Sequence, residues 1–131
     1  GRAPLSQARW GHLGIPLSGG AVLVIGGYNL AGQSMSSTEL FDARSRRWTQ
    51  TAPMTGSARW GHAATPLLDG RVLVTGGVTG VSLRLASAEI FDSSTRTWSQ
   101  TPDMASMRDQ HTATLMADGR VLGAGGWDGV R

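Results

Sequence analysis

The chain has 131 residues, a net charge of +3 and a hydrophobic fraction of 40%. An apolar fraction of this size is typical of a folded domain and excludes a disordered chain. Because it contains no cysteine, a disulfide scaffold, a thiolate metal site and a cysteine nucleophile are excluded. No apolar run approaches the roughly 20 residues that a membrane-spanning helix needs, so we expect no membrane partner.

The positive charge does not indicate a nucleic-acid-binding protein. All twelve basic residues are arginine, and only Arg44, Arg46 and Arg47 lie close together in the chain. Binding to phosphates requires basic residues that gather on one face or in one groove. We therefore interpret the arginines as part of a mixed, solvated surface and predict no nucleic-acid partner.

An internal repeat of about 50 residues organises the chain. The tetrapeptide Arg-Trp-Gly-His occurs twice, and a third copy keeps the arginine and the histidine at the same spacing. The three histidines, His12, His62 and His111, are 50 and 49 residues apart. Each copy continues with a glycine-containing turn, a Val-Leu pair and a double glycine. A period of this length predicts an array of structural repeats.

Each unit is predicted to contain four short strands, which the second unit illustrates. Residues 62–67 form the first strand, and Asp69-Gly70 predicts a two-residue hairpin turn with positive φ at both centres. The apolar run 71–75 predicts a buried second strand. Residues 88–91 form the third strand, and the fourth begins at Trp98. Four antiparallel strands per unit are typical of one propeller blade.

The repeat predicts an all-β array that does not close a ring. Residues 1–7 are the tail of a preceding blade, 8–54 the first blade, 58–104 the second, and 107–131 a half blade with two strands. Propellers close with roughly four to eight blades. An open array exposes apolar sheet faces that favour association. We therefore expect either a fragment or engineered piece of a larger propeller, or a chain that closes a ring by self-association.

The units resemble kelch repeats. The resemblance rests on a double glycine, an aromatic residue in the third strand and a tryptophan behind it: Gly26-Gly27, Phe41 and Trp48, then Gly76-Gly77, Phe91 and Trp98. The tyrosine usual in the third strand is phenylalanine in both units. The resemblance covers nearly the whole chain and implies kelch-type β-propeller blades, four-stranded antiparallel sheets that serve as a protein-interaction module.

The histidines and glutamates are candidate chemical groups that the repeat assigns to structural roles. Zinc ligands must all lie about 2 Å from one ion, whereas the repeat assigns one histidine to each blade. We expect each histidine to bond local backbone at a strand start, the alternative being a ring of histidines that lines a channel. Glu39 and Glu89 are separated in the same way, and we expect them to accept hydrogen bonds from Arg9 and Arg59 or from glycine amides.

The sequence predicts no catalytic residue, metal or cofactor. Galactose oxidase, a catalytic relative with a kelch-type propeller, uses a tyrosine cross-linked to a cysteine, a second tyrosine and histidines around copper. This chain has no cysteine and a single tyrosine, Tyr28. We predict a non-catalytic interaction scaffold. The alternative is the propeller portion of a carbohydrate-binding or galactose-oxidase-like enzyme whose catalytic residues lie outside this chain.

The loops after the double glycines differ between units and are the predicted binding sites, because loops on a rigid scaffold usually carry function. Aromatic residues there anchor protein partners or stack on sugars. The expected partners are a second copy, the missing blades of a parent propeller, another protein or a glycan. Trp10 and Trp60 match each other and are interpreted as packing between blades. The candidate partner-binding residues are Tyr28, Asn29, Leu30, Gln33, Thr79, Arg84, Trp127 and Asp128.

Overall fold

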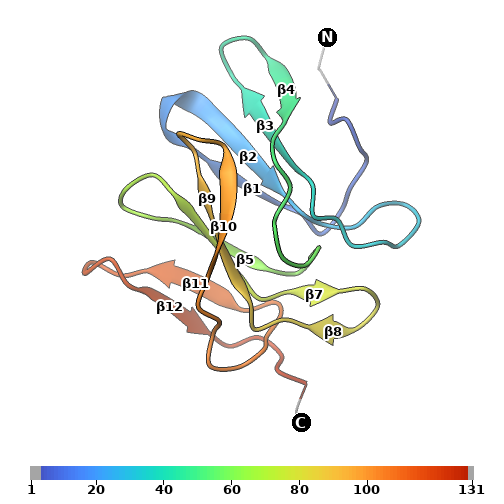
Figure 1. Ribbon diagram of the computed structural model, residues 1–131, viewed down its shortest axis with the longest axis vertical. Coiled ribbons are helices and arrows are strands. Elements are labelled where there is room, and N and C mark those ends of the chain that lie inside the picture. The colour runs from blue at the N-terminus through green and yellow to red at the C-terminus, as the bar shows by residue number, and fades with distance from the viewer. Residues whose placement is uncertain (1–3, 130–131) are drawn as a thin grey trace.

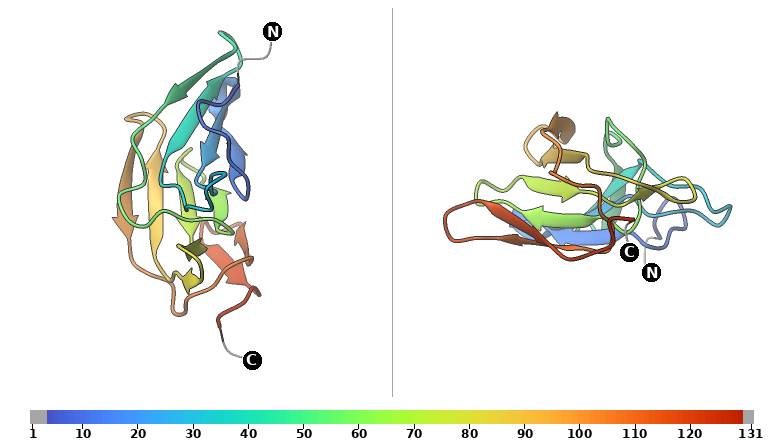
Figure 2. Two further views of the ribbon diagram at one scale, coloured as in Figure 1. Left: turned by 90° about the vertical axis from the view of Figure 1, so that its right-hand side faces the viewer. Right: turned by 90° about the horizontal axis from the view of Figure 1, so that it is seen from below.

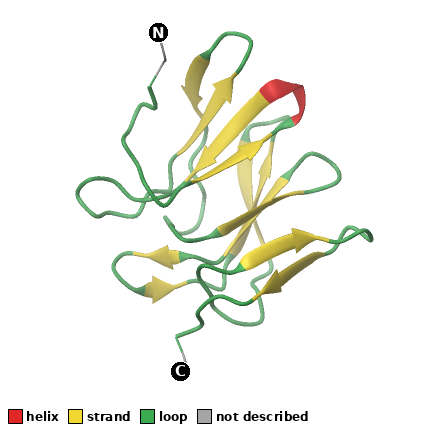
Figure 3. Cartoon of the chain, turned by 180° about the vertical axis from the view of Figure 1, so that it is seen from behind, coloured by secondary structure: helices red, strands yellow, loops and turns green. Residues whose placement is uncertain are grey.

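The computed structural model describes residues 4–129, in which regular structure is almost entirely β (Figure 3). The one helical segment is a 3-10 turn, η1 (Ser18–Gly20), and no helix of this region is long and apolar enough to cross a membrane. The strands are β1 (Leu13–Pro16), β2 (Ala21–Ile25), β3 (Thr38–Asp42), β4 (Arg47–Gln50), β5 (Ala63–Pro66), β6 (Val72–Thr75), β7 (Val78–Thr79), β8 (Leu83–Arg84), β9 (Ala88–Asp92), β10 (Thr97–Thr101), β11 (Thr112–Leu115) and β12 (Val121–Ala124).

The strands form two four-stranded antiparallel sheets and one two-stranded sheet that continues the array. Blade 1 has the order β1-β2-β3-β4, blade 2 the order β5-β6-β9-β10, and half blade 3 consists of β11 and β12. The inner strands β1, β5 and β11 lie next to one another, and blade 1 and half blade 3 occupy opposite ends of the longest axis (Figure 1). The predicted kelch-type architecture is confirmed, and the ring is open.

The main core lies between blades 1 and 2, which stand against each other in the side view (Figure 2). The buried side chains of Leu23 and Ile25 from β2 meet Phe91 and Trp98 from β9 and β10. The indole Nε1 of Trp98 also donates to the hydroxyl of Thr38 at 3.3 Å. The aromatic residues of blade 2 therefore pack on blade 1, and the two blades share one core.

The hairpin turns differ from the predicted two-residue form. The Leu67 amide donates to the Arg71 carbonyl at 2.7 Å, and the Gly70 amide donates to the Leu67 carbonyl at 3.1 Å. Gly70 has a φ of 86°, while Asp69 does not have positive φ. This is a three-residue loop, a type I turn closed by a glycine in the left-handed region. Aspartate suits it because its carboxylate accepts from the Arg71 amide at 3.1 Å.

A further hairpin, β7–β8, occupies a segment that the sequence predicts as an irregular loop. Val78 pairs with Arg84 and Thr79 with Leu83. Gly80, with a φ of 59°, provides the bend between them. Two residue pairs are too few to produce a recognisable alternation in the sequence, which is why the pattern did not predict this hairpin.

Candidate interaction surface

The double glycines fix the joints from which the variable loops emerge. A Cβ on Gly77, which has a φ of 95°, would lie 2.7 Å from the Trp60 carbonyl oxygen of the same blade. A Cβ on Gly76 would lie 2.3 Å from the Arg108 carbonyl oxygen of half blade 3. The Gly77 amide also donates to that Arg108 carbonyl at 2.9 Å. One glycine therefore contacts the segment that precedes its own inner strand and the other contacts the next blade, and neither position has room for a side chain.

An aromatic cluster lies at the joint between blades 1 and 2. The backbones of Trp10 and Tyr28 exchange hydrogen bonds at 2.9 and 3.1 Å. Their rings stack with centroids 4.4 Å apart, and the ring of Trp60 lies 5.3 Å from that of Tyr28. Tyr28 is half-buried, whereas Trp10 is 55% exposed. Trp60 thus packs across the blade joint as predicted, while Trp10 stacks within its own blade and presents its ring at the surface.

The rest of the first loop is shaped by Asn29. Its Oδ1 accepts hydrogen bonds from the amides of Ala31 and Gln33, both at 3.0 Å, and its Nδ2 donates to Gln33 Oε1 at 3.1 Å. Two of the predicted binding residues, Asn29 and Gln33, therefore hold the loop in one conformation. Leu30 at its tip is 87% exposed. The loop offers a rigid platform with an apolar tip.

A charged cluster lies at the joint between blade 2 and half blade 3. Arg84 donates from Nε to Asp109 Oδ1 at 2.6 Å, and its guanidinium carbon lies 5.2 Å from the centroid of the Trp127 ring. Trp127 is half-exposed, and its backbone pairs with that of Asp109 at 2.9 and 3.0 Å. Asp109 was not among the residues predicted from the sequence. The available signal was the third copy itself, which has aspartate where the other two have tryptophan.

These clusters form one surface, which we call the loop face. The Ser34 hydroxyl lies 3.5 Å from the Gly80 carbonyl oxygen and joins the first loop to the β7–β8 hairpin. Of the other predicted residues, Thr79 is half-buried in β7 and Asp128 is exposed beside Trp127. The loop and the hairpin project from the same side of the molecule (Figure 1). The apolar and cationic members of the loop face are Trp10, Tyr28, Leu30, Val81, Leu83, Arg84 and Trp127.

The two glutamates form buried ion pairs, as predicted. Glu89 Oε2 accepts from Arg59 Nη2 at 3.1 Å, and Glu89 Oε1 accepts from the amides of Thr55 and Gly56 at 2.7 and 3.0 Å. Burial lowers the pKa of the Arg59 guanidinium, and the Glu89 carboxylate offsets part of that effect. Glu39 holds the same position 3.5 Å from Arg9. Both carboxylates are thus engaged in tying the interblade linker to the third strand.

The rings of His62 and His111 lie against the preceding blade. The prediction that they bond local backbone is therefore wrong. A Cβ on Gly26 would lie 3.1 Å from the His62 ring, which therefore fills the space over that glycine of blade 1. Within the described residues neither nitrogen of His62 has a hydrogen-bond partner, whereas His111 Nε2 lies 2.8 Å from the Thr75 hydroxyl. Blade 1 has Ile25 at the position of Thr75, so it offers no side-chain hydroxyl there. Burial lowers the pKa of His62 to about 3, and the positive charge of Arg59 contributes to the same shift.

Residues 4–129 contain no group of three or more His, Cys, Asp or Glu side chains that could hold a metal ion. None of the curated proteins compared with the chain matches it. The family model of the kelch motif matches twice, at residues 9–55 and 59–105. These spans cover most of the chain and contain the two four-stranded blades, their double glycines and their aromatic pairs. The chain belongs to the kelch-repeat family.

Proposed function

We propose that this chain is a non-catalytic interaction scaffold whose open ends associate with a second copy of the chain. Kelch repeats build β-propellers that act as scaffolds for protein interactions. The two glutamates support a non-catalytic role, because both carboxylates are already engaged in buried ion pairs. The proposed self-association rests on the geometry of the two ends of the array.

Each end presents one half of a joint. At the internal joints the Gly27 and Gly77 amides donate to the carbonyls of Arg59 and Arg108, both at 2.9 Å. A histidine ring covers the preceding glycine at each of them. At half blade 3, a Cβ on Gly125 would meet nothing within 4 Å among the described residues. At blade 1, His12 is exposed. The Arg9–His12 segment of one copy would therefore form with the Gly125-Gly126 pair of another copy the same contacts that the internal joints have.

The outer side of blade 1 adds apolar surface to this end. Phe91 and Trp98 of blade 2 are 0% and 6% exposed because they cover blade 1. Their equivalents Phe41 and Trp48 lie in contact with each other, with ring centroids 5.0 Å apart, yet both are only half-buried. A neighbouring blade would bury them in the way that blade 1 buries Phe91 and Trp98. This apolar pair favours docking over solvent exposure.

The test is the native mass measured by light scattering behind size exclusion at several concentrations. We expect a discrete oligomer that His12→Glu and Trp48→Glu each convert to monomer, because a carboxylate then enters the joint without a partner. The matched control is Leu68→Glu in the β5–β6 turn, where Leu68 is 76% exposed, and it should keep the oligomer. A wild-type chain that is monomeric at all concentrations refutes self-association.

Glycan binding is a second candidate, favoured by the exposed rings of Trp10 and Trp127 on the loop face. Sugars stack on such aromatic rings. Titration of neutral oligosaccharides with tryptophan fluorescence as the readout tests it, with Trp127→Ala as the comparison. Saturable quenching that the variant loses supports a glycan ligand. No change in fluorescence leaves protein partners as the occupants of the loop face.

A further inference from the structure

Four arginines of the described region have no side-chain partner, and they lie in two equivalent hairpins. Arg44 and Arg46 belong to the β3–β4 turn, Arg47 begins β4, and Arg96 belongs to the β9–β10 turn. All four are exposed, and none of them forms an ion pair within residues 4–129. We call this group the arginine corner.

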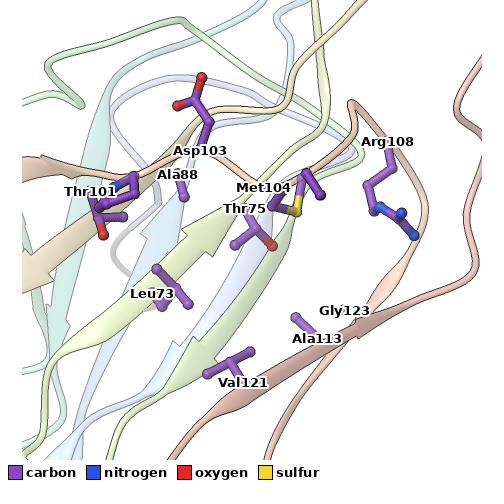
Figure 4. Close-up of a pocket in the computed structure, with 12 residues that line it drawn as sticks. Leu73, Thr75, Ala88, Thr101, Asp103, Met104, Arg108, Ala113, Val121 and Gly123 are labelled. Atoms are coloured by element: carbon purple, nitrogen blue, oxygen red, sulfur yellow. The ribbon is translucent and has the colours of Figure 1, made fainter.

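Every other arginine of the described region has a partner. The arginines of the β5–β6 and β11–β12 turns each pair with an aspartate of the same turn at 2.7 Å. Arg108 lines a pocket of about 330 Å³ beside β12 (Figure 4), and its Nη1 donates to the Gly125 carbonyl at 2.8 Å. The remaining arginines with ion pairs are Arg9, Arg59 and Arg84. The unpaired positive charge of the described residues is therefore concentrated in the arginine corner.

The two turns of the corner lie close enough to share one electrostatic potential. Hydrogen bonds from the Ser45 and Arg44 amides lower the pKa of the Asp42 carboxyl, and the charges of Arg44 and Arg96 add to this shift. Both turns lie in the upper part of Figure 1, away from the loop face. An anion that approaches one turn is therefore attracted by the arginines of both.

The backbone at Arg46 and Arg96 is an independent observation. Their φ angles are 57° and 58°, in the left-handed region that favours glycine. Within the described residues neither side chain forms a hydrogen bond to its turn, which is closed by backbone bonds to Asp42 and Asp92 at 2.7 Å. Both turns thus have an arginine where glycine would fit with less strain. This favours a role for the side chain outside the fold.

The β3–β4 turn has two further arginines that its geometry does not require. Blade 2 has Ser94 and Thr97 at the positions of Arg44 and Arg47. There the Ser94 hydroxyl donates to Asp92 Oδ1 at 2.6 Å and supports the turn. The arginine in its place makes no such bond. Blade 1 therefore gives up a stabilising side-chain contact at this turn and gains positive charge.

A neighbouring blade does not cover turns of this kind. Trp98 is 6% exposed because it packs on blade 1, yet Arg96, two residues before it, is exposed. By the same repeat, a blade packed against Trp48 would leave Arg46 exposed. The arginine corner is therefore accessible in a longer array as well.

The side chains around the corner favour one class of polyanion. Neither turn, at residues 43–46 and 93–96, contains an exposed large apolar side chain. Peptide ligands depend on such anchors, and single-stranded nucleic acids stack their bases on aromatic rings. The exposed residues that continue along β4 and β10 include the hydroxyl side chains of Thr49, Thr97 and Ser99. Hydroxyls bind sugar hydroxyls, and guanidinium groups bind carboxylates in a bidentate manner.

We propose that the arginine corner binds an acidic polysaccharide, whose uronic acid carboxylates pair with its four guanidinium groups. The neighbouring threonine and serine hydroxyls bond the hydroxyls of the sugar rings. The sequence alone brings together the three arginines of the β3–β4 hairpin, and the fold adds Arg96 from the next blade. This inference goes beyond the interaction scaffold, and it uses neither the loop face nor the ends of the array.

The probe is a defined oligogalacturonate titrated into the whole chain by calorimetry. We expect saturable binding that weakens as salt is added, and no binding of a neutral maltooligosaccharide of the same length. Polyglutamate and single-stranded DNA of equal charge should bind about fivefold more weakly, because the corner has no apolar or aromatic anchor for them. No binding of oligogalacturonate, or equal or tighter binding of either competitor, would overturn the proposal.

Two double variants with the same change in net charge separate a local site from general attraction. Arg44→Gln with Arg47→Gln should weaken binding about tenfold, because two charge-assisted contacts are lost. Arg71→Gln with Arg120→Gln is the matched control, since these exposed arginines are already paired in their own turns. It should change the affinity by less than about twofold. Equal losses in the two double variants would refute a site at the corner.

Single variants test the other two arginines. Arg96→Gln should weaken binding if both turns contribute, and an unchanged affinity would contradict a site shared by two blades. Arg46→Gly should weaken binding without lowering the melting temperature, because glycine suits the φ of 57°. A lower melting temperature with unchanged affinity would instead assign Arg46 to the fold. Light scattering on the same samples shows whether self-association is kept, so the outcome for the polysaccharide is read separately.

Discussion

Replacement of Glu89 by glutamine tests whether the buried ion pair holds blade 2 together. Glu89 Oε1 accepts from two backbone amides, Oε2 accepts from Arg59, and both side chains are essentially unexposed. A glutamine has one carbonyl oxygen and therefore must turn its NH2 group either toward the two amides or toward the guanidinium. Removing one partner of such a pair costs about 3–5 kcal/mol. With an m value of about 1–3 kcal/mol/M, the urea midpoint falls by about 2 M.

The matched variant is Glu39→Gln, and urea denaturation followed by far-UV circular dichroism measures both. Glu39 lies 3.5 Å from Arg9, compared with 3.1 Å between Glu89 and Arg59 in blade 2. We therefore expect a smaller loss for Glu39→Gln than for Glu89→Gln. Asp118→Asn removes an exposed ion pair and should barely move the midpoint. An equal loss for the two variants would contradict the link between the shorter ion pair of blade 2 and its larger contribution to stability.

Three further changes probe the joints. The folded-state pKa of His62, about 3, lies below its usual value of 6.5, so the unfolded chain gains a proton first as the pH drops. The free energy of unfolding therefore falls between pH 6.5 and 5, with a slope that approaches about 1.4 kcal/mol per pH unit. His62→Leu should reduce this slope in denaturation curves, and an unchanged slope contradicts the burial. Gly77→Ala should lower the melting temperature more than Gly70→Ala, because only Gly77 has backbone atoms within 3 Å of the new Cβ; equal losses contradict the close approach. Thr38→Val leaves the Trp98 indole without its acceptor and should cost about 1–3 kcal/mol in urea denaturation, with a shift in tryptophan emission; unchanged stability and emission refute the bond.

The sequence was sufficient for the blades because their determinants are local and recur. The run Val72–Thr75, the double glycine behind it and the aromatic residue of β9 each recur at the same spacing. The buried glutamates were predictable for a related reason: a lone carboxylate inside an apolar strand requires a cation, and an arginine recurs with the same period. Such features depend on the chain's own pattern and not on knowledge of its neighbours in space.

The joints were less predictable because they depend on which atoms meet across blades. The ring of His62 points to the preceding blade, a direction that the period along the chain does not contain. Arg84 and Asp109 are 25 residues apart and meet only because the loop of one blade lies against the inner strand of the next. The predicted type of the Asp69-Gly70 turn was wrong for another reason. The same residue pair suits both a two-residue turn and a three-residue turn with a terminal glycine.

The two internal joints share their backbone contacts but differ in what the histidine meets, which sets the strength of the joint proposed between copies. His111 contacts the Thr75 hydroxyl, and blade 1 has Ile25 at the position of Thr75. At the same position β12 has Ala124, which His12 of a second copy would approach. A smaller side chain leaves that joint less completely filled, and a looser fit gives up dispersion contacts. The pocket beside β12 loosens it further, because it leaves part of the apolar surface of half blade 3 without packing partners. Association through half blade 3 should therefore dissociate on dilution while blades 1 and 2 stay together, and an oligomer that persists at the lowest concentration measured would contradict the looser fit.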